Sequence, residues 1–351
     1  MPSTQEEIAP QPAESLPPEA TAGATDANAI EFFQSAYVEL KRQLGKVIVG
    51  QNDVIDEILI AIFTRNHALL MGVPGLAKTL LISTLAKTLT LTFKRIQFTP
   101  DLMPSDITGT EVIHTDPVSG AKEFRFMHGP VFSNIVLADE INRTPPKTQA
   151  AMLEAMQERR VTVGGNTHKL PEPFFVLATQ NPLEQEGTYP LPEAQLDRFL
   201  FLINVDYPNE EEELEIMRRG TSGKLEEPKA IMGAEHIQYL QEAVRQMPVA
   251  DHVYKYAERI VRCTRPKSPE ALDYCKKFLT FGAGPRASLG LIMAAKGHAL
   301  LRGQVYTGCE NVAAIAKSVM RHRMAVNFTA QSEGITADTV VTEMLKAIPA
   351  R

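Results

Sequence analysis

A glycine-bearing loop that ends in a lysine and a threonine lies between the apolar run Ala68–Met71 and the helix-like stretch Leu80–Ile82. In a strand, loop and helix of this order, backbone N–H groups converge on a polyphosphate. The lysine then reaches the outer phosphates, and the threonine ligates Mg²⁺. The sequence therefore predicts a site for ATP and Mg²⁺. Its expected contacts are Gly72, Val73, Pro74, Gly75, Leu76, Ala77, Lys78, Thr79 and Leu80.

A pair of carboxylates provides a second signal. Asp139 and Glu140 follow the short apolar run Asn134–Ala138, which has the pattern of a buried parallel strand. Ligands of open α/β sheets bind at the carboxyl ends of the strands. There Asp139 can hold Mg²⁺ through water, and Glu140 can accept a proton from the water that attacks the γ-phosphate. Ala77 stands where a glycine usually precedes the lysine, so the loop alone also fits an ordinary turn, and the carboxylates favour the nucleotide site.

The elements that must position these residues follow an α/β pattern. Strand-like runs alternate with helical ones, which predicts a five-stranded parallel sheet covered by helices on both faces. The predicted strands are Ala68–Met71, Ile96–Thr99, Ile135–Ala138, Phe174–Thr179 and Phe199–Val205. Two further helices are expected on either side of Ile48–Gln51.

Two hairpins and a helical region complete the predicted architecture. The hairpin strands are Glu111–His114 with Lys122–Phe126, around the turn 116–120, and Arg160–Val163 with His168–Leu170, around the turn 164–166. Beyond Pro208 helical patterns dominate. We therefore expect a nucleotide-binding core over residues 29–208, followed by a linker and a small all-helical domain over residues 209–351.

Composition narrows the class of protein. No apolar run approaches the ~20 residues that cross a bilayer, and the N-terminus lacks a signal sequence pattern, so we expect a cytoplasmic protein. The three cysteines have neither a disulfide nor a metal-ligand spacing. Five of the six net negative charges lie in residues 1–28, a Pro-, Ala- and Glu-rich segment expected to be a disordered acidic arm. The rest of the chain is nearly neutral, which argues against a nucleic-acid partner.

Taken together, the motifs resemble those of the AAA+ ATPases and, within them, of the MoxR family. The resemblance runs from about Ala29 to the C-terminus, and an alanine at the position of Ala77 is typical of that family. It rests on Ile48–Gln51, Gly72–Thr79, Phe98–Gly109, Ala138–Arg143, Ala178–Pro182, Leu196–Phe199, Gly284–Ser288 and Arg321–Arg323.

The resemblance implies roles for further residues. Val49 and Gly50 would contact the nucleotide. Asn181 would be the first sensor, between the γ-phosphate and the attacking water, and Arg286 the second sensor, a lid residue that contacts the phosphates. Arg198 matches the arginine finger that one subunit offers to the γ-phosphate of its neighbour.

Arg143 remains a rival for the role of the finger. The two hairpins resemble the helix-2 insertion and the pre-sensor hairpin, which face the central pore or the substrate.

The implied function is that of an ATP-hydrolysing chaperone that forms a homo-oligomeric ring, with a hexamer expected. It would remodel a client protein during assembly or metal or cofactor insertion, together with a separate von Willebrand factor A-domain partner. Two alternatives remain open. One is a nucleotide-dependent switch that hydrolyses ATP slowly. The other is a nucleic-acid motor that uses the basic hairpin residues His114, Lys122, Arg125, His128, Arg159, Arg160, His168 and Lys169.

Overall fold

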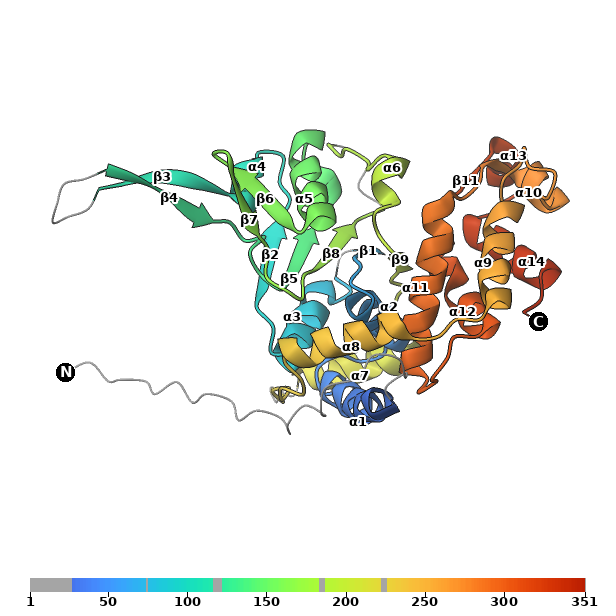
Figure 1. The fold of residues 1–351 in the computed structure, drawn as a ribbon, viewed down its shortest axis with the longest axis horizontal. Coiled ribbons are helices and arrows are strands. Elements are labelled where there is room, and N and C mark those ends of the chain that lie inside the picture. The colour runs from blue at the N-terminus through green and yellow to red at the C-terminus, as the bar shows by residue number, and fades with distance from the viewer. Residues whose placement is uncertain (1–26, 74, 116–121, 183–186, 222–225, 351) are drawn as a thin grey trace.

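The computed structural model describes residues 27–73, 75–115, 122–182, 187–221 and 226–350. At its centre lies a sheet of five parallel strands in the order β2-β5-β8-β1-β9 (Figure 1). The strands are β1 (Ala68–Met71), β2 (Phe93–Gln97), β5 (Ile135–Asp139), β8 (Phe175–Gln180) and β9 (Phe201–Asn204). The predicted five-stranded parallel sheet is therefore confirmed.

The largest difference from the predicted strands is at β2, which begins at Phe93 and ends at Gln97, whereas the apolar pattern predicted Ile96–Thr99. This strand lies at one edge of the sheet, and its residues Lys94 and Arg95 are exposed. An edge strand with exposed charged residues does not give the continuous apolar run of a strand that is buried on both faces. The start of β2 therefore could not be read from an apolar pattern, because that pattern depends on which residues are buried in the folded protein.

Alternate residues of the strands enter two separate hydrophobic cores. Ile135 and Leu137 of β5 belong to the larger core, and Val136 and Ala138 of the same strand belong to the smaller one. This division follows from the two-residue period of a strand, whose successive side chains point to opposite faces. Both faces of the sheet are thus covered, as predicted.

The helices of the first half of the chain build these two layers. In the order of the chain they are α1 (Ala27–Leu44), α2 (Asn52–Phe63), α3 (Lys78–Thr88), α4 (Pro104–Thr108), the 3₁₀ helix η1 (Ile141–Arg143), α5 (Pro146–Glu158) and α6 (Glu193–Leu196). The buried residues of α2 and α3 lie in the larger core, and those of α5 lie in the smaller one. Helix α1 begins at Ala27, two residues before the expected start of order, and residues 1–26 of the predicted acidic arm lie outside the described residues.

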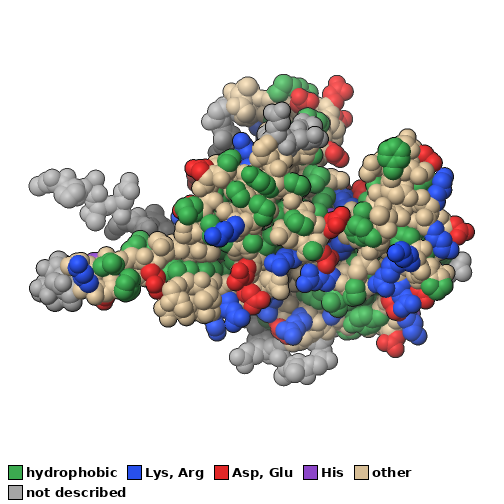
Figure 2. All heavy atoms as spheres, turned by 90° about the horizontal axis from the view of Figure 1, so that it is seen from above, with side chains coloured by type: hydrophobic (Ala, Val, Ile, Leu, Met, Phe, Trp, Pro, Cys, Tyr) green, Lys and Arg blue, Asp and Glu red, His purple; other side chains and the backbone are tan. Residues whose placement is uncertain are grey.

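Two antiparallel hairpins extend from this core. They are β3 (Gly109–Thr115) with β4 (Lys122–His128), and β6 (Arg160–Val163) with β7 (Asn166–Lys169). Both were predicted, and the first turn, 116–120, lies outside the described residues. The β3–β4 hairpin projects well beyond the body of the protein (Figures 1 and 2) and exposes Ile113 and Phe124. At its base, Phe126 stacks on His168 of β7 with a ring-centroid distance of 4.0 Å, so the two hairpins are in contact.

The C-terminal region is mainly helical, and most of it lies to one side of the sheet in Figure 1. Its helices are α7 (Glu210–Thr221), α8 (Ala234–Gln246), α9 (Asp251–Cys263), α10 (Asp273–Phe278), α11 (Pro285–Leu301), α12 (Cys309–Met320), α13 (Phe328–Ser332) and α14 (Ala337–Ala347). We predicted an all-helical domain here, and that prediction missed one short antiparallel pair of strands, β10 (Leu279–Phe281) with β11 (Ala325–Val326). Strands of three and two residues are too short to show an alternating pattern.

None of the described helices combines the length and the apolarity that a membrane crossing requires. The three cysteines, Cys263, Cys275 and Cys309, are buried as free thiols. Burial raises the pKa of the Cys275 thiol to about 11, which is the behaviour of a small hydrophobic core residue.

Candidate nucleotide site

The predicted phosphate loop connects the carboxyl end of β1 with the first residue of α3. Gly72 packs against the chain after β9 so closely that a Cβ atom would lie 2.7 Å from the carbonyl oxygen of Val205. Gly75 has open space around it but adopts a φ of +87°, a conformation that favours glycine. Close packing thus requires the first glycine, and backbone conformation requires the second. Pro74 lies outside the described residues.

Ala77 adopts the left-handed conformation at the N-cap of α3, with φ 52° and ψ 22°. A residue with a Cβ pays about 1 kcal/mol or more in this region, which is why a glycine is usual here. The loop therefore keeps the backbone shape of a phosphate loop despite the alanine. The next residues, Lys78 and Thr79, are partly buried, and Leu80 is exposed.

Lys78 folds back over the loop, where its Nζ donates a hydrogen bond to the carbonyl oxygen of Gly72 at 2.6 Å. Burial lowers the pKa of Lys78, and the negative charges of Asp139 and Glu140 act in the opposite direction. The ammonium group is therefore close enough to both carboxylates to interact electrostatically with them. It lies where a phosphate would replace the Gly72 carbonyl as its partner.

One threonine orients both predicted carboxylate residues. Thr179, in β8, donates its hydroxyl proton to Asp139 Oδ1 at 2.6 Å and accepts the backbone N–H of Glu140 at 2.9 Å. Glu140 itself has left-handed backbone angles, φ 57° and ψ 48°, at the start of η1. The chain thus turns sharply at Glu140, directly after Asp139, the last residue of β5.

Both carboxylates are paired with arginines of the same subunit. Asp139 Oδ2 accepts hydrogen bonds from Arg95 Nη2 at 2.6 Å and Nε at 3.0 Å. Glu140 Oε2 accepts from Gln97 Nε2 at 2.7 Å and from Arg143 Nη1 at 2.9 Å. Arg143, the rival for the finger, therefore lies beside the carboxylate of its own subunit.

Asn181 is buried and follows β8, which lies between β5 and β1 in the sheet. The backbone N–H of Gly72 contacts the carbonyl oxygen of Gln180 at 3.4 Å. Asn181 therefore leaves the sheet between the phosphate loop on one side and Asp139 on the other, which is where the resemblance expects a sensor.

The segment before α2 also contacts the loop. Gln51 Nε2 donates to the carbonyl oxygen of Leu76 at 3.3 Å. Gly50 has a φ of +68°, and a Cβ on it would lie 2.2 Å from Glu212 Oε1 of α7. Gly50 and Gln51 thus connect this segment to α7 and to the phosphate loop, and Val49 directly precedes them.

The sequence did not single out several of these side chains, namely Gln51, Arg95, Gln97 and Thr179. Gln51, Gln97 and Thr179 lie inside or directly beside the segments that carry the family resemblance. Arg95 was missed because β2 has no clear strand pattern at its start. Each of them forms hydrogen bonds with a segment 25 to 44 positions away in the chain, which sequence spacing does not reveal.

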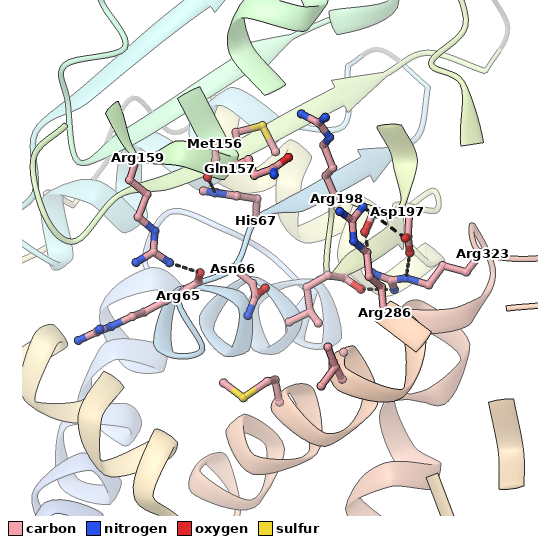
Figure 3. Close-up of a pocket in the computed structure, with 14 residues that line it drawn as sticks. Arg65, Asn66, His67, Met156, Gln157, Arg159, Asp197, Arg198, Arg286 and Arg323 are labelled. Atoms are coloured by element: carbon pink, nitrogen blue, oxygen red, sulfur yellow. Dashed lines mark hydrogen bonds and ion pairs between the residues drawn. The ribbon is translucent and has the colours of Figure 1, made fainter. Parts of the chain in front are cut away.

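Arg198 and Arg286 lie elsewhere, in a pocket of about 370 Å³ shown in Figure 3. The backbone N–H of Leu200 donates to the carbonyl oxygen of His67 at 2.8 Å, which places this pocket at the amino ends of β9 and β1. Lys78 lies beyond the carboxyl end of β1, a strand of four residues that spans roughly 13 Å. Within one subunit, the structure does not bring Arg198 or Arg286 to the phosphate loop.

The arginines of this pocket form two groups (Figure 3). At one end, Asp197 pairs with Arg323 at 2.8 Å and with Arg286 at 3.6 Å, while Arg198 Nη1 donates to the carbonyl oxygen of Leu153 at 3.0 Å. At the other end, Arg159 Nη2 donates to the carbonyl oxygen of Arg65 at 2.8 Å. The pocket therefore has a surplus of positive charge and suits an anion.

The residues at the carboxyl edge fit a magnesium nucleotide. The loop leaves open space at Gly75, a partly buried ammonium lies over it, and Asp139 is a nearly buried carboxylate, with a side chain 13% exposed. Mg²⁺ is usually bound by one or two carboxylates together with phosphates and water. Thr79 and Asp139 would hold the ion, and Lys78 would contact the outer phosphates.

Known proteins resemble this chain over most of its length. A model of the ATPase family associated with various cellular activities (AAA) matches residues 67–201, and a model of the AAA lid domain matches residues 273–344. The chain is 43% identical to the chaperone MoxR1 of Mycobacterium tuberculosis, over 96% of this chain and 86% of the relative.

Two further relatives were found. The uncharacterized protein YeaC of Bacillus subtilis is 42% identical, over 87% of this chain and 92% of its own length. The crystal structure of a candidate ATPase from Cytophaga hutchinsonii superimposes with a TM-score of 0.85 at 40% identity, and covers 92% of this chain and 97% of that one.

Proposed function

This chain belongs to the MoxR family of AAA+ ATPases, and we propose that it hydrolyses ATP at the edge of the sheet where Lys78, Asp139 and Glu140 meet. The observation that carries the proposal is the position of Thr179, whose hydroxyl contacts both Asp139 and the backbone of Glu140. A single side chain thus fixes the carboxylate of Asp139 and the backbone of Glu140.

The proposed chemistry uses these residues in distinct roles. Backbone N–H groups of the loop and Lys78 bind the phosphates, and Mg²⁺, when bound, neutralises part of their charge. Glu140 takes the proton from the attacking water, and Gln97 and Arg143, which both donate to its Oε2, hold the carboxylate at this edge of the sheet. Asn181, beside the loop, orients that water. Val49 and Gly50 contact the nucleotide from the side of α7.

Arg198 and Arg286 act on the nucleotide of a neighbouring subunit in this proposal. They lie at the amino ends of the strands, so a phosphate at Lys78 of the same subunit is out of their reach. Subunits of a closed ring meet through two different surfaces. We propose that these surfaces are the amino edge of one sheet and the carboxyl edge of the next. The anion suited to the arginine pocket is then the neighbour's γ-phosphate. This requirement calls for a homo-oligomeric ring, and the family resemblance makes six the expected number of subunits.

At the level of the whole protein, we propose a chaperone that remodels a client protein during assembly or metal or cofactor insertion, in the cytoplasm where ATP is supplied. A separate von Willebrand factor A-domain protein would present the client. Residues 29–208 would form the nucleotide-binding core, and residues 209–351 the linker and lid. The projecting β3–β4 hairpin, with Ile113 and Phe124 exposed, would offer apolar contacts to such a partner.

Three of the eight basic residues named for the nucleic-acid alternative make contacts within the protein. Arg159 is partly buried and donates to a backbone carbonyl, Arg160 is paired with Glu158, and His168 stacks on Phe126. These side chains are used within the protein. Binding to DNA whose affinity fell steeply with salt would revive this alternative.

Two variants test the proposed site. Lys78→Ala should abolish ATP binding, because it removes the charge that faces the outer phosphates, whereas Glu140→Gln should bind ATP normally and fail to hydrolyse it. Binding is measured with a fluorescent ATP analogue, and hydrolysis by phosphate release. Lys87→Ala, in the last turn of α3, and Glu154→Gln, on the exposed side of α5, are the matched controls. Equal loss of ATP affinity in Lys78→Ala and Glu140→Gln would contradict the catalytic role of Glu140.

A further inference from the structure

The three residues that follow α12 all bind the strand β9 or the segment just before it. Arg321 Nη1 donates to the carbonyl oxygen of Leu202 at 3.2 Å, and His322 Nε2 contacts that of Phe199 at 3.0 Å. Arg323 Nη2 donates to the same Phe199 oxygen at 2.6 Å. Side chains of the lid thus hold a segment of the core through its backbone.

Arg323 makes the most extensive of these contacts. Its Nε donates to Asp197 Oδ1 at 2.8 Å, its Nη1 donates to the carbonyl oxygen of Leu200 at 3.0 Å, and the same Nη1 also contacts the carbonyl oxygen of Val319. Its side chain is only 4% exposed. A buried guanidinium with this many partners holds them in one geometry, because losing any of them leaves a buried polar group unpaired.

Arg198 lies between the residues that Arg323 holds. Asp197 precedes it and Phe199 follows it, and both are bonded to Arg323. The Arg198 side chain itself is bound only lightly, since Nη1 donates to the carbonyl oxygen of Leu153 and Nε is buried without a hydrogen-bond partner among the described residues. The direction of Arg198 is therefore set by its backbone, and its backbone is set by the lid.

Helix α12 also connects to the phosphate loop of the same subunit. Ser318 of α12 donates its hydroxyl proton to Glu57 of α2. Helix α2 begins directly after Gln51, whose amide binds the loop at Leu76. A change at the loop can thus reach α12, and through Arg323 the segment that carries Arg198.

We propose that Arg323 is a positioning residue, which acts through Asp197 and the Phe199 carbonyl to aim Arg198 at the nucleotide of the neighbouring subunit. The lid of one subunit then controls hydrolysis in the next. This inference rests on the proposed role of Arg198 as a finger that acts between subunits.

The test is complementation between variants in mixed oligomers. Arg323→Ala should bind ATP with unchanged affinity, while its kcat falls about 100-fold, as expected when a catalytic group is misplaced by about 1 Å. Mixing Arg323→Ala with Glu140→Gln should restore activity, because some interfaces then join an intact Glu140 to a correctly held Arg198. Mixing Arg323→Ala with Arg198→Ala should restore nothing, because both lack a working finger.

The matched control is Arg262→Ala, which removes an exposed arginine that pairs with Glu258 and Glu270 on the lid surface and should leave kcat unchanged. If Arg323→Ala does not fold, Asp197→Asn takes its place, since the amide keeps the size of the side chain and loses its charge. The same complementation pattern is expected from that variant.

The outcomes separate the two claims. If Arg198→Ala mixed with Glu140→Gln shows no rescue, the proposed finger fails. If that pair is rescued and neither Arg323→Ala nor Asp197→Asn is rescued by Glu140→Gln, the finger stands and the positioning role of Arg323 is overturned. Rescue of Arg323→Ala by Arg198→Ala would overturn it as well.

Discussion

Arg95 and Asp139 form an ion pair between the neighbouring strands β2 and β5, with Arg95 Nη2 at 2.6 Å and Nε at 3.0 Å from Asp139 Oδ2. The guanidinium of Arg95 therefore binds the same carboxylate, that of Asp139, which we propose as a ligand of Mg²⁺. Arginine and Mg²⁺ compete for the same negative charge, so the metal must displace or share this contact.

Removing the competing arginine should strengthen the response to Mg²⁺. We expect that Arg95→Ala lowers, by about two- to fivefold, the Mg²⁺ concentration at which ATP binding is half-maximal. This is the effect of losing an ion pair worth about 0.5–1 kcal/mol, as expected for a half-exposed arginine. Titration of a fluorescent ATP analogue against Mg²⁺ measures it. Lys94→Ala removes a positive charge from the adjacent exposed position of β2 and is the control. An increased Mg²⁺ requirement in Arg95→Ala would show that the arginine supports the site rather than competing for it.

Arg143 should act within its own subunit. Its pair with Glu140 Oε2 at 2.9 Å places it in that subunit's site, so Arg143→Ala leaves Gln97 as the remaining hydrogen-bond donor to this carboxylate among the described residues. We expect about a fivefold lower kcat and unchanged ATP affinity, because a partly exposed pair is worth about 1 kcal/mol. The measurement is steady-state hydrolysis.

Mixing distinguishes Arg143 from Arg198. In a mixture of Arg143→Ala with Glu140→Gln, no subunit combines an intact Arg143 with an intact Glu140, so activity should stay below that of the native protein. Arg198→Ala mixed with Glu140→Gln should gain activity. Clear gain in the Arg143 mixture would instead make Arg143 the finger between subunits.

Glu57 should make the protein less stable at alkaline pH. Burial between α2 and α12 raises its pKa from 4.5 to about 7, with a smaller contribution from Asp53 and Asp338, while the hydrogen bond from Ser318 and the charge of Arg321 lower it. The folded protein thus binds this proton more tightly than the unfolded chain does. The contribution of Glu57 to the free energy of unfolding therefore falls by up to about 3 kcal/mol as pH rises from about 4.5 to about 7, and it stays at the lower value above that pH.

The variant Glu57→Gln should remove this pH dependence, because the amide keeps an oxygen that accepts the Ser318 hydroxyl and cannot ionise. We expect it to be more stable than the native protein at pH 8, by about 1–3 kcal/mol, and nearly equal to it at pH 5. Denaturant unfolding at the two pH values measures the difference. Glu31→Gln, on the exposed side of α1, is the control, and an equal gain in both variants would show that net charge rather than burial is responsible.

Much of the fold could be predicted from local patterns. The strands β1, β5 and β8 are buried on both faces, so each is a short apolar run between turn signals, and the predicted limits differ by at most one residue at each end. The edge strand β2 and the short pair β10–β11 gave no such pattern, because exposed residues and very short strands follow no period. The loop Gly72–Thr79 and the pair Asp139–Glu140 were recognisable because their chemistry is carried by residues adjacent in the chain.

The sequence alone therefore determined which groups can bind a nucleotide, because each group lies in a short continuous segment of the chain. The tertiary structure alone decided how these groups are divided in space. Lys78, Asp139 and Glu140 meet at the carboxyl edge, whereas Arg198 and Arg286 lie at the amino edge and are held there by Asp197 and Arg323. The order of strands brings together residues such as Asp139 and Thr179, which are 40 positions apart, and the packing of the lid joins Asp197 to Arg323, which are 126 positions apart. No local spacing encodes those contacts, because they form only when the two hydrophobic cores assemble.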